Sequence, residues 1–145
     1  MKLIIAGSRD IDDYDALWVL LGCLGIADKV TEIVSGKARG VDTLGESYAR
    51  DLSVPVKDFP AKWNDLEADF CRIKVNKSGR EYNACAGFAR NEDMAKYADA
   101  CVILRHPESP GSLDMLKRAK AHKLKYCDAV YMGKGQATVI RENSI

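Results

Sequence analysis

The sequence predicts an α/β protein, a Rossmann-like three-layer sandwich with helices on both faces of a mostly parallel five-stranded sheet. The first observation is that short apolar runs alternate along the chain with longer segments of helical spacing, which is typical of βαβ units. The second is that each βαβ unit must connect its parallel strands by a crossover, and right-handed crossovers place the helices against the faces of the sheet. The third is the length of 145 residues, which suits one domain with a single core.

Three strands and two helices are predicted in the first half of the chain. The strands are the apolar runs 2–6, 31–34 and 54–59, and the last contains a proline that favours a strand start or a sheet edge. The helices are residues 14–24 and 41–52, where apolar residues recur at helical spacing. This order gives two successive βαβ crossovers.

The second half of the chain repeats the pattern twice. A helix over residues 89–97 precedes a buried strand over 100–104, and a helix over 112–122 precedes a strand over 125–131. These strands are the fourth and fifth of the predicted sheet.

We expect a single Rossmann-like domain over residues 1–132, interrupted by a small insertion at about 64–83. The insertion is polar, and the turn signal at residues 76–79 (NKSG) favours a hairpin that stands off the sheet. A solvated loop without further structure is the alternative. Residues 133–145 are predicted to be a polar C-terminal tail that frays, and we assign them no role.

Composition excludes several classes of partner. The formal net charge is +1 from 22 basic and 21 acidic residues, which disfavours binding of nucleic acid through bulk charge but allows a local basic patch. The longest uncharged apolar stretch, residues 16–27, is too short to span a membrane. We therefore expect a cytoplasmic protein with no membrane partner.

Cysteines and histidines give no sign of a metal site or a cofactor. The five cysteines are dispersed without a CxxC pair, so we expect free thiols. His106 and His122 are too isolated in the sequence to suggest metal ligands. Residues 10–15 lack the central glycine and the closing glutamate of a calcium loop, and helix capping by Asp12 or Asp13 is the better interpretation.

Three loops of unusual composition follow the first, second and fourth predicted strands, at residues 7–10, 35–42 and 105–112. In a parallel sheet these loops share the edge where ligands bind. They combine glycine, hydroxyl groups and basic side chains with helix N-termini, which is the chemistry of phosphate binding. The charge would come from arginine and lysine, including Arg105. The candidate ligand-binding residues in these loops are Gly7, Ser8, Arg9, Ser35, Gly36, Lys37, Ala38, Arg39, Gly40, Asp42, Gly111 and Ser112.

Some of these residues have a purely structural alternative. Asp42 could cap the following helix, and an N-cap role for Ser112 would overlap with phosphate binding. Trp63 and Tyr82 flank the insertion and could stack on a base or cover the sheet edge. Neither GxxxxGK[ST] nor GxGxxG is present, so the standard motifs for nucleoside triphosphates and dinucleotides have no support.

Four stretches of the chain together resemble the SLOG superfamily, the Rossmann-like group named for its SMF/DprA and LOG members. The resemblance is greatest to its YspA/YpsA-related branch, known as the DUF2493 domain. The stretches are residues 5–9 (IAGSR), 35–42 (SGKARGVD), 86–94 (AGFARNEDM) and 110–115 (PGSLDM). The resemblance implies binding of a nucleotide or a nucleotide-derived small molecule, in signalling or phage–host conflict, and makes a homo-oligomer a candidate assembly.

The enzymes of this group, the LOG-type phosphoribohydrolases, release the base from a nucleoside monophosphate. They use an arginine in an MxxRKxxM-like helix, which Arg90 matches, and a glutamate in PGGxGTxxE, whose position is Met115 here. Asp114 lies one position earlier, about 100° round the helix. Methionine can neither stabilise an oxocarbenium-like transition state nor activate water. Catalytic residues are thus not assigned, and Arg90 and Asp114 are the candidates.

Three hypotheses follow. The first is binding of a nucleotide-derived small molecule, with Arg90 and Asn91 near its sugar or phosphate, although both residues could instead tie their helix to a neighbouring loop. The alternative is a nucleotide N-glycosidase that uses a carboxylate such as Asp42, Asp114 or Glu108. A DprA-like nucleic-acid binder is the second alternative, which the balanced charge disfavours.

Overall fold

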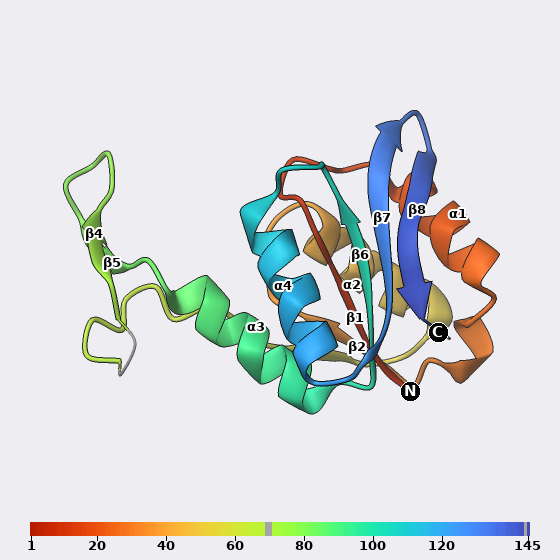
Figure 1. Cartoon of the computed structure of the whole chain (residues 1–145), viewed down its shortest axis with the longest axis horizontal. Coiled ribbons are helices and arrows are strands. Elements are labelled where there is room, and N and C mark those ends of the chain that lie inside the picture. Colours follow the sequence, from red (N-terminus) through yellow and green to blue (C-terminus); the bar gives the residue numbers. More distant parts are fainter. Residues whose placement is uncertain (69–70, 144) are drawn as a thin grey trace.

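A six-stranded sheet with helices on both faces forms the body of the protein (Figure 1). The structure is a computed structural model that describes residues 1–68, 71–143 and 145. The sheet order is β3-β2-β1-β6-β7-β8, with parallel neighbours except for the β7–β8 pair. The predicted fold class is confirmed. The strands of this sheet are β1 (Lys2–Gly7), β2 (Glu32–Ser35), β3 (Val56–Asp58), β6 (Ala100–Arg105), β7 (Lys125–Gly133) and β8 (Gln136–Asn143).

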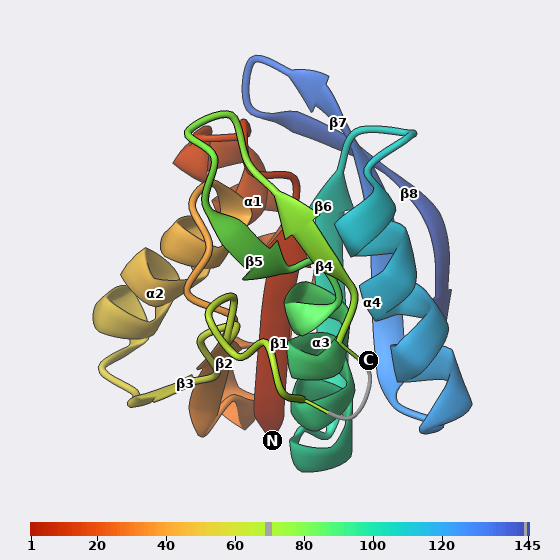
Figure 2. The ribbon, with the colours of Figure 1, turned by 90° about the vertical axis from the view of Figure 1, so that its left-hand side faces the viewer.

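Two pairs of helices cover the sheet, one pair on each face (Figure 2). On one face, Leu17 and Leu44, which belong to the helices over residues 14–24 and 41–52, pack in a core cluster with Leu3 and Ile5. On the other face, Met94 and Leu116, which belong to the helices over residues 86–97 and 110–121, pack with further buried residues of β1 and β6. None of the helices in the described part of the chain is long and apolar enough to cross a membrane. The helices are α1 (Tyr14–Leu24) and α2 (Val41–Leu52), α3 (Ala86–Tyr97) and α4 (Pro110–Ala121), with a short 3₁₀ turn η1 (Ala27–Lys29).

Local signals account for both ends of α1 and for the start of α4. Asp13 caps α1, because its Oδ1 accepts a hydrogen bond from the Ala16 amide at 3.1 Å. Gly25 ends α1 in the left-handed conformation, with φ 63°. Pro110 occupies the first turn of α4, where its missing amide hydrogen costs nothing. α3 begins three residues before the predicted position, at Ala86.

The insertion forms the predicted hairpin. β4 (Ile73–Val75) pairs antiparallel with β5 (Glu81–Asn83), and the turn between them is closed by Asn76, whose Oδ1 accepts hydrogen bonds from the amides of Ser78 and Arg80. The hairpin lies beyond the N-terminal end of α3, away from the six-stranded sheet (Figure 1).

The C-terminal segment differs from the prediction. Residues 133–145 were expected to form a frayed tail beside a five-stranded sheet, but β8 adds a sixth strand antiparallel to β7. Most of β8 is exposed on the sheet edge, which explains its polar composition. Backbone pairing with β7 and two hydrogen bonds of Asp13, from the Tyr131 hydroxyl and the Gly135 amide at 2.7 Å each, hold this end of the chain.

The strand order positions the functional site. The chain runs outward from β1 through β2 to β3, then returns to the other side of β1 for β6 and β7. The order therefore reverses between β1 and β6, and such a reversal leaves a crevice at the carboxyl ends of the two strands. The loops that follow β1, β2 and β6 all meet at this edge.

Candidate ligand-binding site

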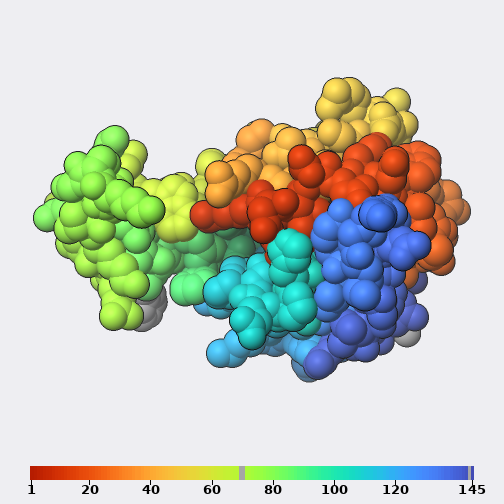
Figure 3. Space-filling model, turned by 90° about the horizontal axis from the view of Figure 1, so that it is seen from above, coloured from red at the N-terminus to blue at the C-terminus, as the bar shows by residue number. Residues whose placement is uncertain are grey.

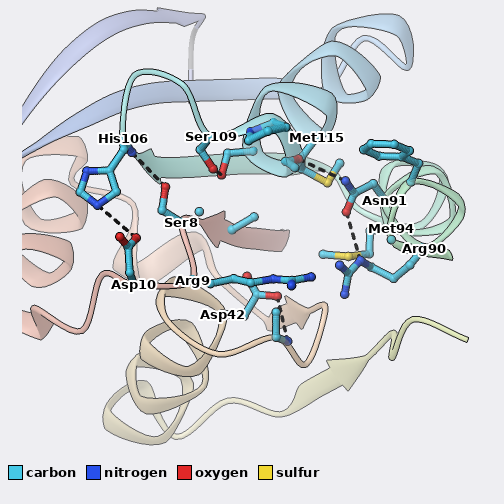
Figure 4. Close-up of a pocket in the computed structure, with 18 of the residues that line it drawn as sticks. Ser8, Arg9, Asp10, Asp42, Arg90, Asn91, Met94, His106, Ser109 and Met115 are labelled. Carbon is cyan, nitrogen blue, oxygen red and sulfur yellow. Dashed lines mark hydrogen bonds and ion pairs between the residues drawn. The ribbon is translucent and has the colours of Figure 1, made fainter. Parts of the chain in front are cut away.

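A pocket of about 700 Å³ opens where the strand order reverses (Figure 4). Its walls come from the loops after β1, β2 and β6 and from the first turns of α2, α3 and α4. The predicted residues that line it are Gly7, Ser8, Arg9, Ala38, Asp42, Arg90, Asn91, Gly111 and Ser112. An adjoining recess of about 590 Å³ is lined by Gly36, Lys37 and Arg39 together with Arg9, Ala38 and Arg90.

The first two loops touch through their backbones. The Val41 amide donates to the Ser8 carbonyl at 3.3 Å, and Gly40 has a φ of 77°. A Cβ on Gly40 would lie 2.4 Å from the Ser8 carbonyl oxygen, so only glycine allows this approach. The Ser8 hydroxyl accepts a hydrogen bond from the His106 amide at 2.9 Å, which ties the first loop to the third and leaves the hydroxyl hydrogen to donate.

The first turn of α4 borders the pocket with free amide groups. The Ser109 hydroxyl bonds to the Ser112 hydroxyl at 2.8 Å instead of capping the helix. A Cβ on Gly111 would have no neighbour within 4 Å, so this turn is open to a ligand. Amides in the first turn of a helix lack intrahelical acceptors and carry partial positive charge, so they suit an anion.

Arg90 joins α3 to the second loop. Its Nη1 donates to the Gly36 carbonyl, and its Nε donates to the Asn91 side chain at 3.1 Å. A Cβ on Gly36 would lie 2.4 Å from Arg90 Nη1, so glycine makes room for the guanidinium. Burial, and to a smaller extent the charge of Arg9, lowers the pKa of Arg90. Arg9 extends across the pocket, so two cations converge on one site (Figure 4).

Asp42 is a buried carboxyl in the pocket wall, only 6% exposed. Burial raises its pKa to about 6, although the charge of Arg90 and a hydrogen bond from the Ala38 amide at 3.3 Å act in the opposite direction. Ala38 precedes α2, so Asp42 braces the second loop with this bond. A group that titrates near neutral pH in a pocket is suited to exchange protons with a ligand.

Two predicted residues of the second loop are held by a side chain that the sequence did not single out. The Ser35 hydroxyl donates to Glu46 Oε2 at 3.1 Å, and the Lys37 ammonium pairs with Glu46 Oε1 at 2.6 Å. Hydrogen bonding and charge from Glu46 raise the pKa of Lys37. The periodicity of α2 could have shown Glu46 on the face toward this loop, one turn after Asp42.

The two residues at the expected catalytic position face different ways. Met115, 1% exposed, lines the pocket. Asp114 Oδ2 accepts hydrogen bonds from Arg118 Nε at 2.8 Å and from Asn91 Nδ2 at 3.0 Å, so its carboxylate is engaged between α3 and α4. Asn91 also donates to the Gly111 carbonyl at 3.3 Å and so bridges the two helices beside the pocket. A thioether thus occupies the place of the carboxylate that the LOG resemblance leads one to look for.

Several lining residues lie outside the predicted set of ligand-binding residues, although Trp63 was considered for base stacking. His106 Nε2 lies 3.1 Å from Asp10 Oδ1, and both line the pocket. Trp63 and Phe88 add aromatic surface. Arg105, which the loop composition suggested as a source of charge for the ligand, instead makes a buried bidentate pair with Asp128. Arg105 is buried at the end of β6, so its guanidinium pairs with Asp128 inside the protein and does not reach the pocket.

Among the residues that the structure describes, no group of three or more His, Cys, Asp or Glu side chains is arranged to hold a metal ion. The ionisable and polar side chains that line the pocket are Ser8, Arg9, Asp10, Asp42, Arg90, Asn91, His106, Glu108, Ser109 and Ser112.

Comparison with solved structures identifies relatives of the fold. DNA processing protein A (DprA) from Streptococcus pneumoniae is similar with a TM-score of 0.62 and 20% identity, covering 88% of this chain and 49% of that one. DprA from Helicobacter pylori, whose structure is described as giving insight into its single-stranded DNA binding mode, is similar with a TM-score of 0.53 and 18% identity, covering 87% and 63%. The chain thus spans about half to under two thirds of either relative.

Sequence comparison gives a family. No curated protein matches the chain significantly. A family model matches residues 1–65, which include the first two loops of the pocket and end just after Trp63. The matching family is the YspA, cpYpsA-related SLOG family, which confirms the predicted resemblance over residues 1–65, the part that holds the first two of the four motif stretches.

Proposed function

We propose that the pocket binds the phosphate-bearing end of a nucleotide or nucleotide-derived molecule. The observation that carries this proposal is the convergence of Arg9, Arg90 and the free first-turn amides of α4 on one pocket at the reversal of strand order. The relationship to the SLOG family and the DprA-like fold are consistent with binding of a nucleotide or nucleic acid.

The residues divide between the two ends of such a ligand. A phosphate would accept hydrogen bonds from the Gly111 and Ser112 amides and from the Ser8 hydroxyl, while the two arginines supply charge. It would also relieve the repulsion between Arg9 and Arg90. Met94 and Met115 form an apolar wall against which a sugar or base could pack. A volume of about 700 Å³ is ample for one nucleotide.

The test is calorimetry with AMP, ADP-ribose and cyclic nucleotides, supported by thermal shift. We expect binding of at least one of them, weakened about tenfold or more by Arg9→Ala and by Arg90→Ala, since hydrogen bonds to charged groups contribute about 1.5–3 kcal/mol. Gly36→Ala should weaken binding as well, because its methyl group displaces the Arg90 guanidinium.

Two matched controls isolate the site. Arg50→Ala removes the same charge from an exposed position on α2, and Gly22→Ala adds the same methyl group in open space on α1. Both should leave affinity unchanged. Absence of binding by every nucleotide, or wild-type affinity in Arg9→Ala and Arg90→Ala, would refute the proposal.

A second candidate is cleavage of the N-glycosidic bond of the bound nucleotide. The specific observation is Asp42, a buried carboxyl in the pocket wall whose pKa is raised to about 6. As a carboxylate it could stabilise an oxocarbenium-like transition state or activate water. Chromatography should then detect free base, with release abolished in Asp42→Asn and retained in Asp114→Asn. No release by the wild-type protein would leave binding alone.

A single-stranded nucleic acid is a second class of molecule that the pocket could bind through a terminal nucleotide. The balanced net charge predicts no nucleic-acid partner, whereas a relative of the fold is described with single-stranded DNA. A single strand is therefore included in the experiment on the neighbouring groove.

A further inference from the structure

A groove of about 680 Å³ separates the β4–β5 hairpin from the body of the protein and joins the pocket (Figure 3). The groove and the pocket share four lining residues, Arg9, Trp63, Ala84 and Phe88. A ligand that leaves the pocket past Arg9 therefore enters the groove directly. Apart from Arg9, Trp63 and Asn64, the groove is built from residues beyond the region that matches the family model.

The hairpin turns its polar face toward this groove. Lys74 pairs with Tyr82 across the two strands, and both line the groove together with Arg80. Side chains alternate along a strand, so Ile73 and Val75 point the opposite way, where they are 51% and 63% exposed. Burial of apolar surface alone would favour the reverse orientation, with Ile73 and Val75 against the body. The groove thus receives Lys74, Arg80 and the Tyr82 ring from the hairpin, together with one carboxylate, Glu81.

Aromatic rings line the groove beside these cations. Trp63 and Tyr82 lie edge to face with ring centroids 6.3 Å apart, and Phe88 is 40% exposed. The Trp63 carbonyl accepts a hydrogen bond from the Asn83 amide at 2.7 Å, which ties the backbone at Trp63 to the hairpin. Gly87 leaves room for it, since a Cβ there would lie 3.2 Å from Trp63. Trp63 therefore packs between Tyr82 of the hairpin and Gly87 of α3.

We propose that the hairpin groove is a second subsite, which binds the second nucleoside of a ligand built from two nucleosides joined through phosphate. Its base would stack on Tyr82 or Phe88, because every nucleobase has a face that stacks on an aromatic ring. Lys74 and Arg80 supply charge for phosphate. Arg9 lines both cavities with its guanidinium 5.7 Å from the Trp63 ring, so it is placed for the bridging phosphate. The proposal rests on the proposed function of the pocket.

Calorimetry with four probes tests the subsite: AMP, diadenosine pyrophosphate, the dinucleotide pApA and a single-stranded dodecamer. We expect at least one two-nucleoside probe to bind about tenfold or more tightly than AMP, the gain that one stacked base provides. Tyr82→Ala, Lys74→Ala and Arg80→Ala should each reduce this gain while AMP affinity is retained. Tyr82→Phe should preserve it, because the ring remains. Lys77→Ala changes the same charge in the hairpin turn and should have no effect.

The outcomes separate the two proposals. Absence of binding by AMP, ADP-ribose and cyclic nucleotides alike in the wild-type protein would contradict the proposed function of the pocket. Normal AMP binding, with two-nucleoside probes no tighter than AMP or unaffected by Lys74→Ala and Arg80→Ala, would overturn the subsite alone. If Tyr82→Ala loosens the hairpin, Lys74→Ala and Arg80→Ala still test the subsite. Preference for diadenosine pyrophosphate would support a free dinucleotide as ligand, and preference for pApA and the dodecamer would support the end of a single strand.

Discussion

At the scale of single residues, the site depends on Gly36, against which Arg90 and Asp42 both pack. A Cβ at this position would lie 2.4 Å from Arg90 Nη1 and 2.7 Å from Asp42 Oδ2. The guanidinium and the carboxyl thus share a buried space that only glycine leaves open. The family motifs draw attention to all three residues, but their contact joins segments more than fifty positions apart in the chain.

The raised pKa of Asp42 predicts a pH-dependent cost to stability. Because the folded pKa of about 6 exceeds the ordinary value of 3.8, the folded state binds this proton more tightly than the unfolded chain does. The stabilisation is present below about pH 4 and is lost as the pH rises through about 6. Asp42→Asn should therefore gain stability relative to wild type over this range, on the order of 2–3 kcal/mol.

Urea unfolding of both proteins at pH 4.5, 6 and 7.5 measures this difference. Asp28→Asn, which removes a charge from an exposed position, serves as the control and should follow the wild-type pH profile. Parallel profiles for Asp42→Asn and the wild type would show that Asp42 is ionised at little cost.

At the scale of elements, the hairpin shows how far local sequence reaches. The NKSG turn and the flanking strands are predictable, because turn residues and alternation act over a few positions. The side of the hairpin that faces the protein is not predictable in this way. Its orientation depends on Trp63, which lies before the hairpin in the chain and is wedged against Gly87 after it.

The base of the hairpin predicts a specific disulfide on oxidation. The Ala84 amide donates to the Arg72 carbonyl at 2.7 Å, so the ladder continues past the Ile73–Asn83 pair. Continued by one further residue beyond Arg72 and Ala84, this register would place Cys71 opposite Cys85 at a non-hydrogen-bonded position, where Cα atoms approach to about 4.5 Å. Diamide should couple them, each thiol giving one proton and one electron to the diazene, which becomes a hydrazine.

Peptide mapping by mass spectrometry should find the two cysteines linked, with the loss of two hydrogens. Burial raises the pKa of the Cys71 thiol, so coupling should be faster at pH 9 than at pH 7. Closure of a loop of about 15 residues should also raise the thermal midpoint. Use of Cys23→Ser removes an exposed competing thiol. Recovery of Cys71 and Cys85 as free thiols after oxidation would contradict the register.

At the scale of the whole molecule, one carboxylate connects the two ends of the chain. Asp13 caps α1 through the Ala16 amide and accepts hydrogen bonds from Tyr131 and Gly135, which belong to β7 and the following turn. The predicted cap is confirmed, and its second role explains why the polar C-terminal segment is held on the sheet. These hydrogen bonds, that of Tyr131 first, lower the pKa of Asp13.

Asp13→Ala should therefore destabilise the protein by about 2 kcal/mol, the loss of a helix cap together with two tertiary hydrogen bonds. Because the folded pKa is lowered, the contribution is present above the unfolded pKa and is lost as the pH falls below about 4. Urea unfolding at pH 7 and pH 3.5 measures both effects. The neighbouring exposed Asp12→Ala should have little influence at either pH, and equal stability of the two variants would contradict the role of Asp13.

Local signals in the amino-acid sequence suffice to predict the succession of strands and helices, most of their boundaries to within a few residues and the three loops that meet at the pocket. These features arise from side-chain periodicity, glycine and capping residues, which act within one element or between chain neighbours. The sequence did not reveal the sixth strand, the pairing of Lys37 with Glu46, the engagement of Asp114 by Arg118 or the groove beside the hairpin.

These four features follow from the folded arrangement, because each depends on which residues lie close in space. The pKa of Asp42 is set by desolvation among loops that come together when the sheet forms, and β8 is held by backbone pairing with β7 together with the hydrogen bonds that Asp13 accepts from Tyr131 and Gly135. The distribution of charge in space also depends on folding. Its net value says little about partners, since folding gathers Arg9 and Arg90 at one pocket and leaves most other charges dispersed over the surface.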